Sequence, residues 1–211
     1  MKIKTFLNSI RTEKSERAQS MVEFLIAIPV LILLLSGVVE FGFALNYYLS
    51  VLDATRYGAR LGSDASPFVD DYGSAKDNAF YNTIYDAVIW NLDPSLDPQF
   101  ASIEVGRRIP VDPSADDVIV SVYSTCNGAI TTVESSSKYG NASTALNPAD
   151  LQAHLVSGSP KAGILVVEVR YNFHQVLQLP WFTAVVPDPM PLTAYSIMPL
   201  RSAEDPDCDD T

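Results

Sequence analysis

The chain is poor in basic residues, in histidine and in cysteine. Its 211 residues include 14 Lys and Arg against 25 Asp and Glu, which gives a formal net charge of −11, and they include only two His and two Cys. A nucleic-acid-binding protein needs a basic face to meet the phosphates, so this charge argues against a nucleic-acid partner. Two His and two Cys cannot form a four-ligand structural zinc site without carboxylates.

The motifs of an enzyme are also missing from the sequence. It contains no nucleophile elbow, no glycine loop that would cradle a phosphate and no zinc motif. His154 and His174 do not have the spacing of metal ligands. The acidic runs Asp70–Asp71 and Asp112–Asp117 lack the spacing of an EF-hand, which favours solvated loops over a calcium site. We therefore predict no catalytic residue, no metal site and no cofactor.

Charge and apolar residues are divided unevenly along the chain. Residues 1–17 carry a net charge of +3, whereas residues 64–211 carry seven basic and 20 acidic residues. Between them, Phe24–Val39 is a run of 16 residues without any charge. A transmembrane helix needs about 20 predominantly apolar residues, and Met21–Leu45 supplies them. The basic flank predicts a cytoplasmic N-terminus and an acidic domain outside the cytoplasmic membrane.

Two other interpretations of the apolar run are a buried core helix and a cleaved secretory signal with its cut near Gly42 and Ala44. Sixteen uncharged residues beside a basic flank argue against the core helix. The helical pattern continues past the supposed cut, which argues against the signal. One stripe at helical spacing is formed by Phe41, Leu45, Tyr48, Leu52, Thr55, Ala59 and Gly62. A helix over Gln19–Gly62 would be about 66 Å long, half of it in the bilayer and half an amphipathic stem.

Three motifs lie before, within and after this region. They are Arg17–Phe24 (RAQSMVEF), Gly37–Gly42 (GVVEFG) and Ala54–Arg60 (ATRYGAR). Together with the Leu-rich run, they resemble the TadE-like family, which comprises pilin-related proteins of tight-adherence (Tad) type IV pilus systems. The resemblance is strong over Arg17–Gly62, weaker over Ile164–Arg201 and absent over roughly residues 64–160.

The resemblance implies processing by a prepilin peptidase. Type IV prepilins are cut after a small residue, usually Gly, so that a Glu occupies the fifth mature position. Counting back from Glu23 makes Gln19 the first mature residue and places Ala18 before the cut, where Ala departs from the usual Gly. Residues 1–18 would then be a basic cytoplasmic leader, and the transmembrane helix would stay in the mature protein.

The resemblance also gives Glu23 a role in assembly. A carboxylate inside an apolar bundle costs about 3 kcal/mol on insertion scales. The new α-amino group of Gln19 on a neighbouring subunit would offset this cost and fix the axial register between packed helices. The alternative is that Glu23 only ends the span at the headgroups.

Three further charged residues mark the outer end of the span and the stem. Glu40 is expected at the outer interface. Arg56 and Arg60 lie one turn apart and would face acidic residues of the exported domain, a partner's stem or solvent. We therefore expect this group to contribute stem or partner contacts.

The fold class predicted for the whole chain is α+β. A long transmembrane and stem helix, residues 19–63, would pack on a small antiparallel sheet within an exported domain, residues 64–211. A helix is predicted over Lys76–Asn91, and strands over 101–109, 118–123, 163–179 and 192–198, the third of them half-buried. The stretch 127–160, rich in Ser, Gly and Asn, is predicted to be a long surface insertion with at most one short helix, at Pro148–Val156.

Both cysteines, Cys126 and Cys208, lie in the predicted exported part, where disulfides can persist. Their even number predicts one bridge between them. Two unpaired thiols are the alternative, because sequence does not show whether their Cα atoms come within bridging distance.

Two functional hypotheses follow. The first is a pilin-like subunit of the cytoplasmic membrane, a structural component or an assembly factor of a Tad-type pilus. Its partners would be other pilin-like subunits through the N-terminal helix, a prepilin peptidase, the pilus assembly platform and membrane lipid. The second is a single-pass, membrane-tethered binding module, an adhesin or a sensor, that would use the 127–160 insertion as its contact surface.

Overall fold

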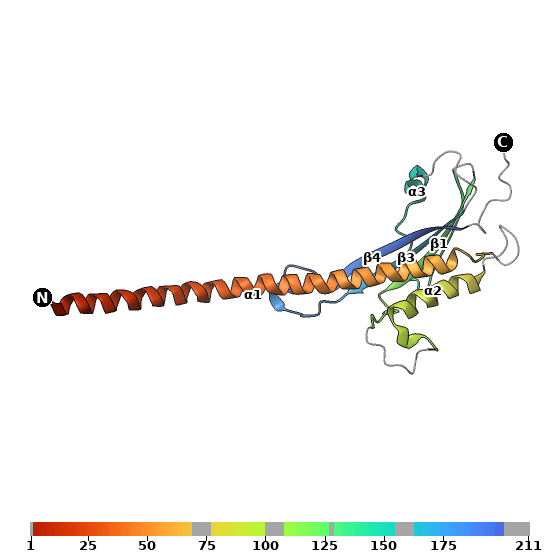
Figure 1. Ribbon diagram of the computed structural model, residues 1–211. Helices are drawn as coiled ribbons and strands as arrows, with labels where there is room; N and C mark the ends of the chain where they lie inside the picture. The colour runs from red at the N-terminus through yellow and green to blue at the C-terminus, as the bar shows by residue number, and fades with distance from the viewer. Residues whose placement is uncertain (1, 69–76, 100–107, 127–128, 155–162, 201–211) are drawn as a thin grey trace. The chain divides into compact units, whose positions relative to one another are not determined.

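The computed structural model of the protein describes residues 2–68, 77–99, 108–126, 129–154 and 163–200. The helices are α1 (Lys2–Gly62), α2 (Asn78–Leu92), the 3-10 helix η1 (Pro94–Leu96), α3 (Pro148–His154) and α4 (Pro180–Thr183). The strands are β1 (Asp117–Cys126), β2 (Ala129–Ser137), β3 (Gly163–Phe173) and β4 (Met190–Leu200). The predicted α+β class is therefore confirmed (Figure 1).

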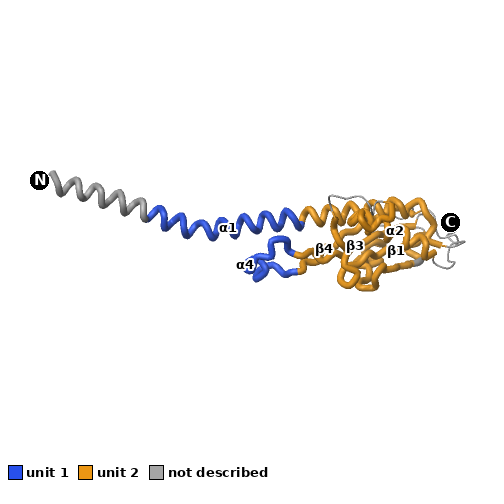
Figure 2. The backbone as a smooth tube through the Cα atoms, turned by 90° about the horizontal axis from the view of Figure 1, so that it is seen from below, with its two compact units in different colours: residues 1–44, 175–188 blue, residues 45–174, 189–211 orange. Residues whose placement is uncertain are grey.

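The chain divides into two compact units, coloured separately in Figure 2. Unit 1 consists of residues 1–44 and 175–188, and unit 2 of residues 45–174 and 189–211. Helix α1 is continuous through both units and through Pro29, and it ends at Gly62 as predicted. Only 6% of its most apolar 18-residue window is buried against the described chain, which excludes the core-helix interpretation.

Within unit 2, α1 buries a stripe of small residues. Ala54, Thr55, Gly58, Ala59 and Gly62 are all buried. The predicted stripe is thus right in its C-terminal half. Further back on the helix, Leu45 and Tyr48 of the same stripe are exposed.

At this end of the stem the inward-facing residues are Tyr47 and Val51 instead. Val51 is fully buried. The ring centroid of Tyr47 lies 5.9 Å from that of Tyr171 and 5.1 Å from that of Phe173, both on β3. A shift of one residue along the helix therefore separates the predicted stripe from the observed one.

Small residues are needed because α2 and the sheet approach α1 closely. A Cβ added at Gly58 would lie 2.5 Å from Cγ2 of Val88 on α2. A Cβ added at Gly62 would lie 2.5 Å from Cδ1 of Ile84 and 2.6 Å from Cδ2 of Leu165 on β3. Helix α2 begins at the N-cap Asp77, whose carboxylate accepts from the Ala79 amide at 2.8 Å, and it buries its apolar face.

The sheet has the strand order β2-β1-β3-β4, and all three pairs are antiparallel. Strands β1 and β3 are central, and both of their faces are covered. On β3, Leu165, Val167, Val169, Tyr171 and Phe173 share one face, as predicted. The other face is also buried, because Val166 and Glu168 are fully inaccessible, so the prediction of a half-buried strand is wrong.

The segment that follows β2 covers this second face, and buried carboxylates hold it there. Asp117 accepts hydrogen bonds from the amides of Tyr139 (3.1 Å) and Ala142 (2.8 Å). Glu168 accepts from the hydroxyl of Thr144 and from the amide of Ala145, the latter at 2.9 Å. Much of the predicted surface insertion is therefore part of the folded domain, and β2 contradicts the prediction that it holds at most one short helix.

The remaining element predictions have mixed outcomes. The helix over 76–91 and the strands over 118–123 and 192–198 are confirmed by α2, β1 and β4, and the short helix of the insertion is confirmed as α3. The predicted strand 163–179 is too long, since β3 ends at Phe173. Of the predicted strand 101–109, residues 101–107 lie outside the described residues, and Arg108 and Ile109 are not in a strand.

Replacing Gly58 by Ala should destabilise unit 2. The new methyl group would meet Val88, a β-branched and fully buried side chain that has no flexible end to move aside. We expect the free energy of unfolding of the full chain in detergent to fall by about 1–3 kcal/mol, as for other overpacked cores. Denaturant titration followed by near-UV circular dichroism measures it.

Gly42→Ala is the matched control, because no atom lies within 4 Å of a Cβ at that position. Ala is favoured over Gly in a helix by about 1 kcal/mol, so this variant should be at least as stable as the parent chain. Equal effects of the two substitutions would contradict the close packing of α1 on α2.

Candidate functional site

The most unusual feature of the described chain is the segment between β3 and β4. Residues 175–187 contain no Asp, Glu, Lys or Arg. This segment belongs to unit 1, where it lies beside the first part of α1 and carries the short helix α4 (Figure 2). The site described below is therefore formed by two pieces of chain that are more than 130 positions apart.

Glu40 joins the two pieces. Its side chain is only 3% exposed, and its two carboxylate oxygens accept hydrogen bonds from successive backbone amides, Val176 at 2.6 Å and Leu177 at 3.0 Å. Hydrogen bonds to a charged acceptor are stronger than those between neutral groups. The sequence places Glu40 at the outer interface of the span, but it does not reveal these partners.

The two ends of the segment are also tied to each other. The Gln175 amide donates to Oδ1 of Asp188 at 3.3 Å, and Nε2 of Gln175 donates to the Val186 carbonyl at 2.9 Å. Next to the Glu40 contact, Gln178 has a φ of 47°, in the left-handed region that non-glycine residues seldom occupy. Such a backbone conformation costs about 1–3 kcal/mol and persists only where the surroundings impose it.

The aromatic residues of α4 lie against α1. A Cβ added at Gly37 would lie 3.8 Å from the ring of Phe182, so the ring packs directly over this glycine. Trp181 borders two grooves. One has a volume of about 440 Å³ and extends from Leu33 to Phe41, and the other has a volume of about 400 Å³ and extends from Ile28 to Leu33. Every residue that lines either groove is apolar.

Glu23 lies further toward the N-terminus on the same helix. It is exposed, and its Oε1 accepts a hydrogen bond from Nε2 of Gln19 at 3.2 Å. It is separated from Glu40 by 17 positions, or about 26 Å of helix, so the two carboxylates form separate sites. The side chain of Ala18 lies outside the described residues.

The remaining predicted site residues are not brought together. Arg56 forms an exposed ion pair with Asp53 at 3.5 Å, one turn away on α1, and such pairs contribute little to stability. Arg60 is exposed. Cys126 is disulfide-bonded at the end of β1, but Cys208 lies outside the described residues, so the pairing of the two stays a prediction.

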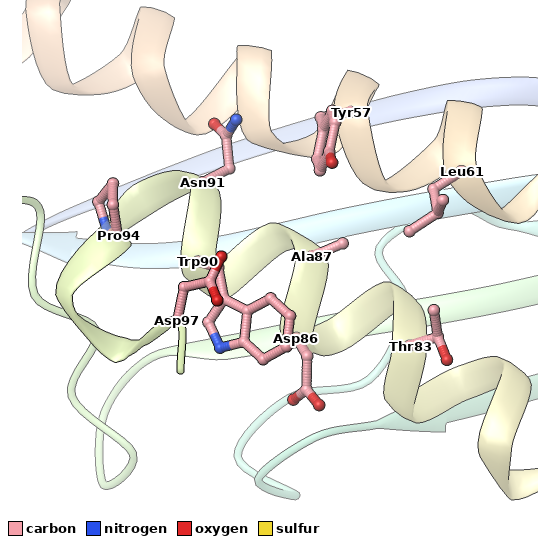
Figure 3. A pocket seen from close by; sticks show the side chains of 9 residues that line it. All are labelled: Tyr57, Leu61, Thr83, Asp86, Ala87, Trp90, Asn91, Pro94 and Asp97. Atoms are coloured by element: carbon pink, nitrogen blue, oxygen red, sulfur yellow. The ribbon is translucent and has the colours of Figure 1, made fainter. Parts of the chain in front are cut away.

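Unit 2 carries a groove of about 420 Å³ between α1, α2 and the turn that follows α2 (Figure 3). Its lining includes the aromatic residues Tyr57 and Trp90 and two carboxylates, Asp86 and Asp97. Asp86 forms an ion pair with Lys138 at 3.2 Å. The lining contains neither His nor Cys. The hydroxyl of Thr83 donates a hydrogen bond to the backbone carbonyl of Ala79. The groove therefore lacks the pairing of a nucleophile with a His base that nucleophilic catalysis commonly uses.

Among the residues that the structure describes, no group of three or more His, Cys, Asp or Glu could hold a metal ion. Asp112 and Asp116, from one of the acidic runs, use their carboxylates to bind chain amides. Asp112 accepts from Ser114 at 2.8 Å, and Asp116 accepts from Asn172 at 2.7 Å. Asp70 and Asp71 lie outside the described residues.

Residues 18–60 match the family described as TadE-like protein. The resemblance to this family is therefore confirmed over this segment, which includes the charge-free run of α1 and most of the stem. No match was found among curated proteins or among solved structures.

Sequence analysis did not identify the segment 175–188 as part of a site. Its first residues look like a continuation of the alternating strand, so the predicted strand was extended to residue 179. A signal was available, because Val176–Val186 (VLQLPWFTAVV) is a charge-free, largely apolar stretch, and Pro180 argues against a central strand that includes it.

Replacing Glu40 by Ala should release the segment from α1. The substitution leaves the amides of Val176 and Leu177 without an acceptor, and an orphaned buried donor costs about 1–3 kcal/mol. We expect hydrogen exchange of these amides, measured by mass spectrometry on the full chain in detergent, to accelerate by at least tenfold.

Glu23→Ala is the matched control, since it removes an exposed carboxylate from the same helix. It should leave the exchange of both amides unchanged. Unchanged protection in Glu40→Ala would show that Glu40 does not hold the segment.

Proposed function

We propose that the protein is a membrane-anchored, pilin-related subunit associated with a Tad-type pilus. One observation carries this proposal. The segment that matches the TadE-like family, residues 18–60, contains the charge-free run of α1, whose apolar side chains the rest of the described chain leaves largely uncovered. In the proposed arrangement, this helix crosses the cytoplasmic membrane with residues 1–17 inside and the sheet domain outside.

The exposure of this run supports a membrane environment. Phe24, Leu31 and Leu35 are each more than 60% exposed, and most other residues of the run are exposed as well. Monomeric soluble proteins rarely expose continuous apolar patches of more than a few hundred Å². A bilayer would cover this surface without any further protein, and the basic residues before it favour a cytoplasmic N-terminus.

Glu23 would set the register of the subunit among its neighbours. Its carboxylate is exposed on α1, and one of its oxygens accepts a hydrogen bond from a side chain of the same helix, Gln19. Cleavage after Ala18 would give Gln19 a charged α-amino group. The α-amino group of an adjacent subunit would then replace the Gln19 side chain as the hydrogen-bond donor to Glu23. Its hydrogen bond would be charge-assisted, and therefore stronger than the one from the neutral side-chain amide.

The proposed role is structural, without catalysis. The described grooves are either fully apolar or, in unit 2, without a nucleophile beside a base. The partners would be other pilin-like subunits, a prepilin peptidase, the assembly platform and membrane lipid. We propose neither a cofactor nor a nucleic-acid partner.

Replacing Glu23 by Gln tests the subunit role. The substitution keeps the shape and removes the negative charge, so the register contact would be lost while membrane insertion is kept. We expect the variant to be present in the membrane fraction at normal levels and to be absent, or reduced at least tenfold, in sheared pili or in the crosslinked assembly complex.

Asp53→Asn is the matched control, because it neutralises an exposed carboxylate of the same helix outside the apolar run. It should assemble normally. Normal assembly of Glu23→Gln would instead support a simple membrane-tethered binding module. The intact mass of the same samples locates the mature N-terminus, which is expected at Gln19, whereas a start near Leu45 would indicate ordinary secretion.

A further inference from the structure

The apolar segment Val176–Val186 leaves much of its own surface uncovered, in addition to the uncovered surface of α1. We propose that this segment is a membrane-inserted hairpin, and that its side chains lie among the lipid acyl chains beside α1. The proposal rests on the proposed membrane anchoring by α1, but not on any role in a pilus. The lipid contact would give the exported domain a second attachment to the membrane.

The side chains of the hairpin are apolar apart from Gln178 and Thr183, and most of them are exposed. Val185 is 84% exposed, and Val176 and Trp181 are each close to half exposed. The nearest charged residue after the segment is Asp188, at the neck of the hairpin, where it binds the Gln175 amide. In water, this loop would leave most of its apolar side chains in contact with solvent, so their burial would not stabilise the fold.

Much of the hairpin backbone has hydrogen-bond partners within the protein. A polar backbone group in hydrocarbon must find its partner within the protein. Glu40 takes two amides at the start, and the amides from Phe182 to Val186 all bond to carbonyls of the segment itself. Pro180 and Pro187 have no amide to satisfy.

The position of Trp181 places the hairpin at the depth of the membrane span. It shares a groove with Ile28, Pro29 and Ile32, in the middle of the charge-free run. Pro29 lies 11 positions before Glu40, about 17 Å along the helix, which compares with a hydrocarbon thickness of about 30 Å. Any medium that covers this part of α1 must therefore also cover the hairpin.

Lipid fits this surface better than a second copy of the chain. Trp181 borders both grooves, which together extend along α1 from Ile28 to Phe41, and no polar side chain that a protein partner could bind lines either of them. Acyl chains adapt to both. Glu40 is then a positioning residue, because it holds the start of the hairpin to the helix, while two amide hydrogen bonds within the protein stabilise its own charge.

Fluorescence quenching by brominated lipids tests the proposal. The chain has two tryptophans, Trp90 on α2 and Trp181 on α4. The full chain with Trp90→Phe is reconstituted in phosphatidylcholine vesicles that carry bromine at the middle of the acyl chains. We expect the emission of Trp181 to be quenched several-fold more strongly than that of Trp90 in the matched variant Trp181→Phe.

Two further measurements, alkaline extraction and a series of protein-to-lipid ratios, keep the outcome decisive. Resistance of the protein to alkaline extraction from the same vesicles shows whether α1 is anchored. If it is anchored and Trp181 is quenched no more than Trp90, the hairpin lies outside the lipid and the proposal is wrong, although the anchor holds. Quenching that is lost as the protein-to-lipid ratio rises would indicate a second copy of the chain as the occupant and would also overturn it.

A charge at the hairpin surface provides the final check. Val185→Asp changes a side chain that is 84% exposed, so the packing within the protein is kept. We expect it to reduce the quenching of Trp181 several-fold in the Trp90→Phe background, because a carboxylate resists insertion. Val185→Leu should leave the quenching unchanged, and equal quenching in both variants would contradict insertion.

Discussion

The charge-free run of α1 is the constraint on which the rest of the chain depends. A continuous helix from Lys2 to Gly62 presents 16 uncharged residues, and the described protein covers almost none of them. Water cannot solvate such a surface without a large free-energy cost. The first part of the helix therefore needs a membrane or other apolar helices around it. The second part, from Leu45 onward, loses this requirement because small residues let α2 and β3 approach closely enough to cover it.

Buried carboxylates accept hydrogen bonds from backbone amides of irregular segments throughout the described chain. Glu40, Asp116, Asp117 and Glu168 are all nearly inaccessible, and each accepts backbone amides from a segment far away in sequence. Each therefore fixes an irregular segment whose amides no strand or helix would satisfy. Burial raises the pKa of Asp116, although amide donors from Asn172 and Asp112 oppose the shift. Part of the acidic composition of the chain thus serves its architecture rather than its surface.

Local pattern was sufficient to predict the elements that depend on periodicity. The apolar run, the stop at Gly62, α2 and the alternating face of β3 follow from spacings of 3.6 or 2 residues. The covered face of the stem was misplaced by one residue, because the sequence shows where large apolar residues lie and not where a close approach demands Gly or Ala. Strand β2 was missed because its Ser and Thr residues resemble a loop, and its pairing with β1 is a tertiary effect. The contact between Glu40 and Val176 is also a tertiary effect. No local sequence pattern around either residue predicts that they lie together.

Topology is the most direct test of the account, because every role discussed for α1 needs it to cross the membrane. Ser9→Cys, in the basic flank, is combined with Ala18→Lys, because a large residue before the cut keeps residues 1–18 on the chain, and Asp64→Cys is placed at an exposed position just beyond α1. Each variant is treated in intact cells with a thiol reagent that does not cross membranes, and the parent chain provides the background. The account predicts labelling of Asp64→Cys in intact cells and of Ser9→Cys only after the membrane is permeabilised. Labelling of both positions in intact cells, or of Ser9→Cys alone, would contradict it.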